Sequence, residues 1–224
     1  MNAQRATRNA EPGALPLLVC FALREEAAPF RKISADRPGA LILITGMGRK
    51  NAEKSVRDFL ASHAPTLVLT CGFAGGLNPE LTAGAVVFAT DDVPLRKKLA
   101  AAGARPARFY CTSHIATTAA EKQELRRSTA ADAVEMESEA IHAVCREQGI
   151  SCGTVRVISD TANEDLPLDF NRLANPDLSL DYGRLAVAVA KSPGKIRALL
   201  RLQKQTRLAA EELAEVLDKV TCRT

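Results

Sequence analysis

The chain has 224 residues, of which 46% are hydrophobic and 25% charged, as in an ordinary globular protein rather than a fibrous or disordered one. This length suits a single α/β domain with a sizeable core. The formal net charge of +4 is spread along the chain, and the chain has only two Tyr and no Trp. We therefore expect no nucleic-acid partner, because such binding favours basic patches and stacking aromatic rings.

The cysteines and histidines suggest neither disulfides nor a metal site. The six cysteines have no CxxC spacing and are too sparse for a stapled secreted domain. Cys20, Cys71 and Cys145 lie in apolar runs, as small core residues do. We therefore expect a cytoplasmic protein. None of the three histidines has the spacing of a metal ligand pair, so we expect no metal and no cofactor.

The N-terminal 13 residues are polar and end in Pro12-Gly13, which predicts a flexible tail ahead of one domain over residues 14–224. The apolar run over residues 14–23 is too short to cross a bilayer, which takes roughly 20 residues. It resembles the core of a signal peptide. However, Arg24 and Glu25 follow it with no small-residue cleavage site, which favours a first buried strand.

Strand patterns and amphipathic helical patterns alternate after the tail. The strands are expected at residues 15–21, 41–45, 67–71, 85–90, 108–112, 133–136 and 154–158. The helices are expected at residues 25–32, 50–62, 119–127 and 137–148. Such alternation predicts an α/β fold with a central, mainly parallel or mixed, partly closed sheet and helices on both faces. In such sheets the functional groups gather where strands end and helices begin.

The C-terminal segment, residues 182–220, has a long helical pattern interrupted at Ser192-Pro193-Gly194, because proline breaks a helix. Its second half mixes apolar residues with cations such as Lys195 and Arg197. This pattern is typical of an amphipathic helix that covers a core and exposes a solvated basic face. The alternative is a surface that meets anionic lipid or an acidic partner, and we keep peripheral membrane contact as an expectation.

Two glycine segments follow predicted strands. Gly46 and Gly48 stand just before a helix, where backbone amides can approach an anion, although a simple tight turn has the same pattern. Residues 72–76 (GFAGG) hold three glycines, which indicates close packing of the backbone against a ligand or another strand. Neither segment completes a dinucleotide fingerprint or a P-loop.

Carboxylates gather at two further strand ends. Glu135 and Glu137 flank Met136 at a strand-to-helix junction, and Ser159-Asp160 end a later strand. Acids in the first turn of a helix can simply favour its dipole. Two strands of one parallel sheet would nevertheless bring these acids to one edge, where their pKa values shift and suit acid–base chemistry.

The order of these segments resembles the nucleoside phosphorylase and nucleosidase superfamily, especially the 5′-methylthioadenosine/S-adenosylhomocysteine nucleosidases. The matching segments are residues 22–26 (ALREE), 46–48 (GMG), 71–77 (CGFAGGL), 134–137 (VEME) and 156–160 (RVISD). Residues 118–122 (TAAEK) and the interrupted C-terminal helix resemble one subgroup, the hopanoid-associated phosphorylase-like proteins.

The resemblance implies cleavage of the bond between a purine base and ribose, with a 5′-substituted adenosine as substrate. Asp160 would hold the proton shared with N7 of the purine, because a neutral base leaves more easily than its anion, and Ser159 would orient Asp160. Glu137 would accept hydrogen bonds from the ribose hydroxyls, with Met136 under the sugar and Glu135 beside them. Glu26 would be the base toward the attacking water.

The resemblance also assigns supporting roles. Arg156 would help to place the nucleophile. The remaining expected substrate contacts are Gly72, Phe73, Ala74, Gly75, Ile115 and Phe170. The expected phosphate or nucleophile loop consists of Gly46, Gly48 and Arg24. Related active sites often borrow a residue from a neighbouring subunit, which implies a homodimer.

Two departures from the nucleosidases leave alternatives open. The position of Phe73 is typically serine in those enzymes, and its hydroxyl helps to hold the nucleophile. Residues 90–108 are also shorter than usual, which would leave the 5′ side of the pocket open. Three functions therefore stand: hydrolysis, phosphorolysis of a lipid-linked (hopanoid) adenosine with inorganic phosphate as co-substrate, and nucleoside binding without catalysis.

Overall fold

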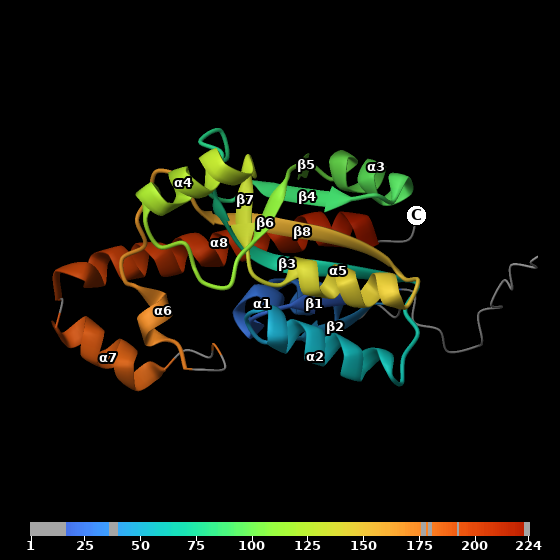
Figure 1. Cartoon of the computed structure of the whole chain (residues 1–224), viewed down its shortest axis with the longest axis horizontal. Coiled ribbons are helices and arrows are strands. Elements are labelled where there is room, and N and C mark those ends of the chain that lie inside the picture. The colour runs from blue at the N-terminus through green and yellow to red at the C-terminus, as the bar shows by residue number, and fades with distance from the viewer. Residues whose placement is uncertain (1–16, 36–39, 176–177, 179–180, 192, 222–224) are drawn as a thin grey trace, which may run out of the picture.

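The computed structural model describes residues 17–35, 40–175, 178, 181–191 and 193–221. The expected tail over residues 1–13 and the first two residues of the expected first strand lie outside the described part of the chain. The predicted α/β fold class is confirmed, because one mixed sheet stands between layers of helices (Figure 1).

One eight-stranded sheet forms the centre of the molecule, with the strand order β2-β1-β3-β8-β4-β5. Two further strands branch from it, since β7 pairs with β3 and β6 pairs with β7. The strands are β1 (Leu17–Phe21), β2 (Ala40–Ile44), β3 (Leu67–Gly76), β4 (Val86–Thr90), β5 (Arg105–Pro106), β6 (Phe109–Cys111), β7 (Ala133–Glu135) and β8 (Ser151–Asp160).

The strand directions place the functional segments. Strands β2, β1, β3 and β8 run parallel, so their carboxyl ends lie at the same edge of the sheet. Strand β4 runs antiparallel to β8. Strand β7 also runs antiparallel to the last residues of β3, with Val134 opposite Gly75. The expectation that parallel strands deliver Glu135 and Asp160 was therefore wrong, because β7 reaches this edge from the opposite direction.

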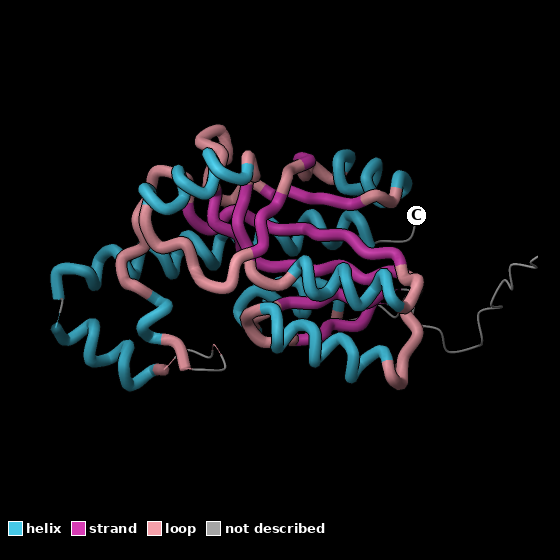
Figure 2. The backbone as a smooth tube through the Cα atoms, viewed as in Figure 1, coloured by secondary structure: helices cyan, strands magenta, loops and turns pink. Residues whose placement is uncertain are grey.

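Helices cover both faces of the sheet, and Figure 2 shows the strands between them. The helices are α1 (Arg24–Ser34), α2 (Arg49–Leu60), α3 (Val93–Ala101), α4 (Ala119–Thr129), α5 (Ser138–Glu147), α6 (Phe170–Leu173), α7 (Tyr182–Lys191) and α8 (Ile196–Thr221), with a 3₁₀ turn, η1 (Pro193–Lys195). On one face α2 packs beside α5, and on the other α1 packs beside α8.

The sheet divides the core into two main hydrophobic clusters. On one face, strand residues such as Val19 and Val155 pack against α1, α3 and α8, with Leu213 of α8 fully buried. On the other face, Leu18 and its strand neighbours pack against α2 and α5. Burial of apolar side chains on both faces fixes the strands, and with them the groups at their ends.

The sequence missed three short elements. Residues 93–101, for which no element was expected, form α3, in which Asp92 caps the helix by accepting from the amide of Leu95. The strand expected at residues 108–112 is Phe109–Cys111, and the separate strand β5 precedes it. Helix α6 was not expected either. Among the described residues, no helix is long and apolar enough to cross a membrane.

Candidate active site

The glycine segment of β3 forms the floor of the candidate site. A side chain at Gly72 would place its Cβ 2.7 Å from Oε1 of Glu26 and 2.8 Å from Nη1 of Arg156. Three residues further along, a Cβ at Gly75 would lie 3.5 Å from Oδ2 of Asp160. Because an extended strand advances about 3.3 Å per residue, the two groups of charges lie roughly 10 Å apart along it.

Glu26 reaches the site from the first turn of α1, just beyond the end of β1. Its Oε2 accepts from the amide of Leu23 at 2.9 Å, and its Oε1 accepts from the amide of Phe73 at 2.8 Å. Burial raises the pKa of Glu26 to about 7, against the opposing effects of the Phe73 amide and the charge of Arg156. A carboxyl group with this pKa suits a general base near neutral pH.

Phe73 takes part through its backbone and not through a polar side chain. Its amide holds Glu26, while its ring packs against the hydrophobic cluster beneath the strand. Ala74, its neighbour, accepts a hydrogen bond from the Ser159 hydroxyl through its carbonyl oxygen. The ring of Phe73 cannot hold a nucleophile, so any activation of a water or phosphate falls to the nearby charged groups.

Arg156 is the central cation of the site and is almost completely buried on β8. It donates to the Cys71 carbonyl and the Thr70 hydroxyl, and its Nη2 lies 2.6 Å from Glu135 and 3.2 Å from Glu137. Burial works against this charge, but the facing carboxylates more than offset it and raise the pKa of Arg156. The guanidinium therefore stays charged.

The two glutamates beside Arg156 have different environments. Glu135 accepts from the Glu137 and Ser138 amides and the Ser138 hydroxyl. Burial alone would raise the pKa of Glu135, but the charge of Arg156 and these donors hold it below its ordinary value. Burial raises the pKa of Glu137, whose Oε1 accepts from the Gly48 amide at 2.8 Å. Glu137 therefore keeps more accepting capacity for a ligand.

The glycine turn after β2 holds Glu137 in place. Gly46 and Gly48 have φ values of 80° and 84°, a region that favours glycine. A Cβ at Gly48 would also collide with the side chain of Leu178, at 2.3 Å. The turn therefore brings a backbone donor to a buried carboxylate. Met136, between the two glutamates, is almost fully buried.

Asp160 ends β8 and forms the second group of charges. Its Oδ1 accepts from the hydroxyl of Ser159 at 2.6 Å, and its Oδ2 forms an ion pair with the ammonium of Lys122. Lys122 is fully buried and also donates to the carbonyl oxygens of Thr161 and Glu164 at 2.9 and 2.8 Å. The ammonium thus ties the acid to the loop that follows it.

Two buried polar side-chain atoms have no hydrogen-bond partner in the described part of the chain, and both belong to this site. They are Nε of Arg156 and Oδ2 of Asp160. The second faces the charge of Lys122 without the geometry of a hydrogen bond. Buried polar groups are normally paired. These atoms therefore mark the places where a ligand would add hydrogen bonds.

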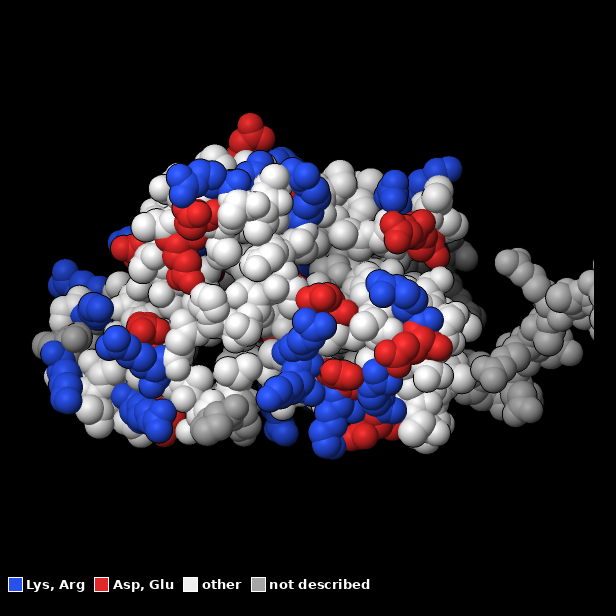
Figure 3. All heavy atoms as spheres, viewed as in Figure 1, with Lys and Arg blue, Asp and Glu red and all other residues white. Residues whose placement is uncertain are grey.

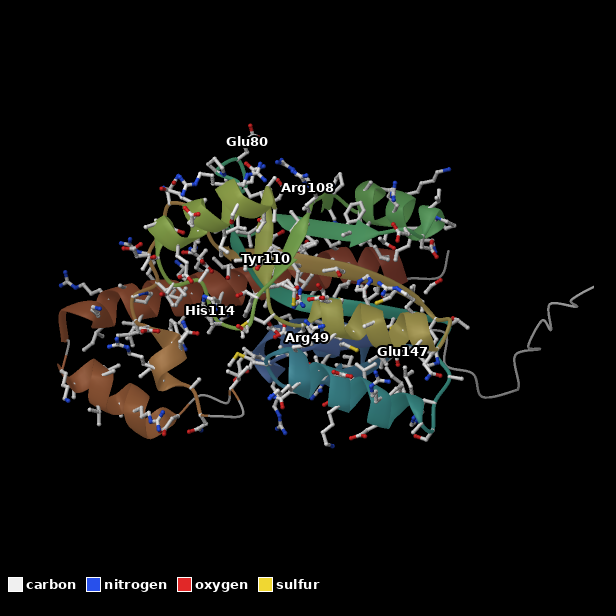
Figure 4. The ribbon with its side chains drawn as sticks, in the orientation of Figure 1. Arg49, Glu80, Arg108, Tyr110, His114 and Glu147 are labelled. Atoms are coloured by element: carbon white, nitrogen blue, oxygen red, sulfur yellow. The ribbon has the colours of Figure 1, made fainter. Side chains whose placement is uncertain are left out.

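The remaining expected contacts lie around these charges. Ile115 is joined to α6, because its amide and carbonyl both bond to the side chain of Asn171, the neighbour of Phe170. Arg24 is exposed at the start of α1. Figure 4 shows Arg49 at the start of α2 and His114 on the loop before α4. Arg49 pairs with Glu139 on the surface, and His114 lies 2.7 Å from Glu121.

Two cavities lie in the part of the chain that the structure describes. A cavity of about 200 Å³ adjoins Asp160 and is bounded by the 164–167 loop and α8. A larger one of about 390 Å³ lies between the start of β4 and α8, away from the charged groups. We assign the substrate to the smaller cavity beside Asp160, because a catalytic site needs charged groups next to the substrate and the larger cavity has none of the site's charges. Among the described residues, no group of His, Cys, Asp and Glu is placed to hold a metal ion.

Comparisons with known proteins fit this geometry. A family model described as "Phosphorylase superfamily" matches residues 105–188, which include Glu135, Glu137 and Asp160. A 5′-methylthioadenosine/S-adenosylhomocysteine nucleosidase of Shewanella halifaxensis is 26% identical over 176 residues, or 62% of this chain and 76% of its own length. By these matches the chain is similar to proteins of the nucleoside phosphorylase and nucleosidase superfamily.

Solved structures of two other proteins share the fold. The 5′-methylthioadenosine/S-adenosylhomocysteine nucleosidase of Neisseria meningitidis, in complex with methylthio-immucillin-A, matches with a TM-score of 0.69 and 18% identity, over 92% of this chain and 98% of the other. The futalosine hydrolase of Helicobacter pylori matches with a TM-score of 0.67 and 15% identity, over 92% and 97%. At such identities the likeness concerns the fold.

The sequence pattern did not single out Lys122, the partner of Asp160. It lies inside the TAAEK segment on α4, 38 positions before its partner Asp160. A lone lysine in an amphipathic helix is normally solvated, so the pattern gave no sign of its burial. The only sign in the sequence that Lys122 could belong to the site was the resemblance of the TAAEK segment to the hopanoid-associated phosphorylase-like proteins.

Proposed function

We propose that this chain cleaves the N-glycosidic bond of a purine nucleoside, with a 5′-substituted adenosine as substrate and adenine as product. The observation that carries the proposal is the buried acid Asp160, whose Oδ2 faces Lys122 but has no hydrogen-bond partner among the described residues. It is set along one strand from the buried side chains of Glu26 and Arg156. The nucleosidase names of the relatives support the same reaction class.

The two groups of charges along β3 would have different roles in the reaction. Asp160 would hold the proton shared with N7 of the purine, so that the bond between N9 and C1′ breaks and its electron pair stays on the base. Glu137 would accept from the ribose hydroxyls above Met136. Its carboxylate would also stabilise the positive charge that develops on the sugar.

The nucleophile would be handled at the other end of the segment. A water that attacks C1′ would lose its proton to Glu26. Arg156 would keep the carboxylates of Glu135 and Glu137 in position. The products would be the free base and the free sugar. Phosphorolysis of a lipid-linked adenosine is the second candidate, with inorganic phosphate in place of water. The side chain of Phe73 makes nucleoside binding without turnover the third.

We further propose a cytoplasmic homodimer that needs no cofactor. The support is the absence of disulfide spacing in the sequence and the resemblance to enzymes whose sites are completed by a neighbouring subunit. Sedimentation at several concentrations would detect the dimer, and a monomer at every concentration would contradict it.

The decisive experiment is a panel of purine nucleosides, read out as free base, with and without inorganic phosphate. We expect base release without phosphate, fastest with 5′-substituted adenosines. Asp160→Asn should lower kcat by at least about 10²-fold, the lower range for a positioned general acid. A matched control is Asp132→Asn, which alters another ion-paired aspartate, one that contacts Arg126 and has no part in the proposed reaction.

Each alternative has its own outcome. An absolute requirement for phosphate would replace hydrolysis by phosphorolysis. Tight nucleoside binding with no base released in either buffer would identify a binding protein. A native rate in Asp160→Asn would overturn the assignment of the acid.

A further inference from the structure

Helix α7, the turn η1 and the first half of α8 extend beyond the sheet at one end of the molecule (Figure 1). The main contacts of α7 are with α6 and η1 rather than with the sheet. The first part of α8 is similarly exposed, and its burial in the core begins at Ala209. We call residues 184–208 the basic surface.

The charge of this segment is strongly one-sided. From Tyr182 to Ala210 the sequence holds seven cations and no Asp or Glu. Because the whole chain carries a formal charge of only +4, the rest of the chain is net acidic. Figure 3 shows Lys and Arg side chains gathered at this end of the molecule. The cations are Arg184, Lys191, Lys195, Arg197, Arg201, Lys204 and Arg207.

Apolar side chains are exposed among these cations. Four of the seven exposed large apolar side chains in the described part of the chain lie here, namely Val187, Ile196, Leu200 and Leu208. Leu200 is 60% exposed, the largest value of the seven. On α8, Ile196 and Leu200 are one turn apart, as are Arg197 and Arg201, so an apolar row and a basic row run side by side, about 100° apart around the helix.

We propose that the basic surface docks this protein peripherally on a bilayer that contains anionic lipid. Exposed leucine and isoleucine side chains can enter the interface, while Lys and Arg keep their charged ends at the headgroups. Each cation near an anionic surface strengthens binding by roughly fivefold. Together, seven cations and a strip of apolar side chains supply the two signals that stable attachment needs.

Other occupants fit this surface less well. A symmetric contact between two copies would place like charges opposite each other, which is unfavourable. Single-stranded nucleic acid favours aromatic stacking, and residues 183–224 contain no aromatic side chain. An acidic protein would satisfy the cations but would leave no reason for the exposed apolar strip.

The same helix reaches the candidate active site. Gln205 of α8 donates to the carbonyl of Ser159 at 2.9 Å, and Ala198, Arg201 and Leu202 line the cavity beside Asp160. Docking through the outer face of α8 would therefore hold this cavity close to the lipid. The attachment itself does not depend on the proposed reaction and is tested without it.

The experiment is co-sedimentation of the full chain with vesicles. We expect binding to vesicles of phosphatidylglycerol mixed with phosphatidylcholine, release at high salt, and no binding to phosphatidylcholine alone. The charge reversal Arg197→Glu/Arg201→Glu should weaken binding at least about tenfold, since two cations are lost and two acids gained. Leu200→Gln should weaken binding while leaving the net charge unchanged.

Matched controls lie on α3, remote from the basic surface. Lys97→Glu/Lys98→Glu makes the same change in net charge, and Val93→Gln replaces another exposed apolar residue. Both should bind as the native chain does. The proposal is overturned if the native chain stays in the supernatant with both kinds of vesicle. Equal weakening by the α3 variants would also overturn it, as would an oligomer that only Arg197→Glu/Arg201→Glu dissociates.

Discussion

The two carboxyl oxygens of Asp160 have different partners, a hydroxyl on one and an ammonium on the other. Ser159 fixes one carboxyl oxygen through a hydrogen bond, whereas Lys122 faces the other with a buried charge and also binds two carbonyl oxygens of the following loop. A buried charge is tolerated only when it is paired. Lys122 therefore couples the position of the acid to the conformation of residues 161–164.

We predict that Lys122→Met lowers kcat at least about tenfold, because a misplaced acid loses part of the roughly 10²–10⁴-fold effect of general acid catalysis. KM should change less, since the groups that meet the sugar are untouched. Arg126→Met is the matched control, because Arg126 on the same helix contacts the carboxylate of Asp132 and two carbonyl oxygens. Both variants should lose stability, but only Lys122→Met should lose turnover. Equal kcat values in the two would refute a positioning role for Lys122.

Glu26 gives a prediction about pH. Its pKa of about 7 means that the carboxylate needed by a base is present above this pH and is protonated below it. We therefore expect kcat/KM to fall as pH decreases through about 7, approaching about tenfold per pH unit. Stopped assays of free base across this range would measure the fall.

Glu137 complicates that profile in a predictable way. Burial raises the pKa of Glu137 too, so its protonation would also lower the rate as pH decreases. Glu26→Gln should leave only a slow rate and remove the part of the limb that belongs to Glu26. A limb near pH 7 that persists unchanged in Glu26→Gln would show that another group is the base.

At the scale of elements, β3 explains why the site needs glycine. The strand continues past its first five residues as the glycine-rich segment GFAGG, and both groups of charges approach this part of its backbone. Gly72 has a φ of 143°, and its missing Cβ leaves room for Glu26 and Arg156. Any side chain here would meet both.

Gly72→Ala should therefore abolish most activity, at least about 10²-fold, and destabilise the fold by about 1–3 kcal/mol through overpacking and backbone strain. Gly103→Ala is the control, because Gly103 has a φ of 100° but no heavy atom within 4 Å of its added Cβ. It should show the strain in thermal unfolding but keep its kcat. Similar kcat losses in both variants would contradict the role of space at Gly72.

The sequence predicted which strands and helices carry the site residues better than how these elements pair and pack in space. The order of strands and helices and the acids at strand ends were readable, because alternation and chain order are local properties. The direction of β7 was not, since strand pairing depends on long-range contacts. The burial of Lys122 was hidden for the same reason, because a solvated and a buried lysine look alike on a short amphipathic helix.

At the scale of the whole molecule, the two halves of α8 have different surroundings. Its second half packs into the core beside α1 and the sheet, where Leu213 and Leu217 are fully buried, and its first half carries the basic surface. Because one half of α8 is packed in the core, the other half is held in a fixed direction relative to the sheet. The position of the basic surface relative to the site therefore depends on the core packing of residues 209–220.

We predict that Leu213→Ala lowers the free energy of unfolding by about 2–5 kcal/mol, the usual range when a buried leucine is truncated. Unfolding should remain a single transition by both circular dichroism and activity, because α8 and the sheet share one core. Leu208→Ala, which truncates a half-exposed leucine of the same helix, should stay within about 0.5 kcal/mol of the native chain. If Leu213→Ala instead melted α8 in an early separate step, with the sheet intact, the helix would be an independent appendage. The cavity beside Asp160 would then be shaped by a dissociable element.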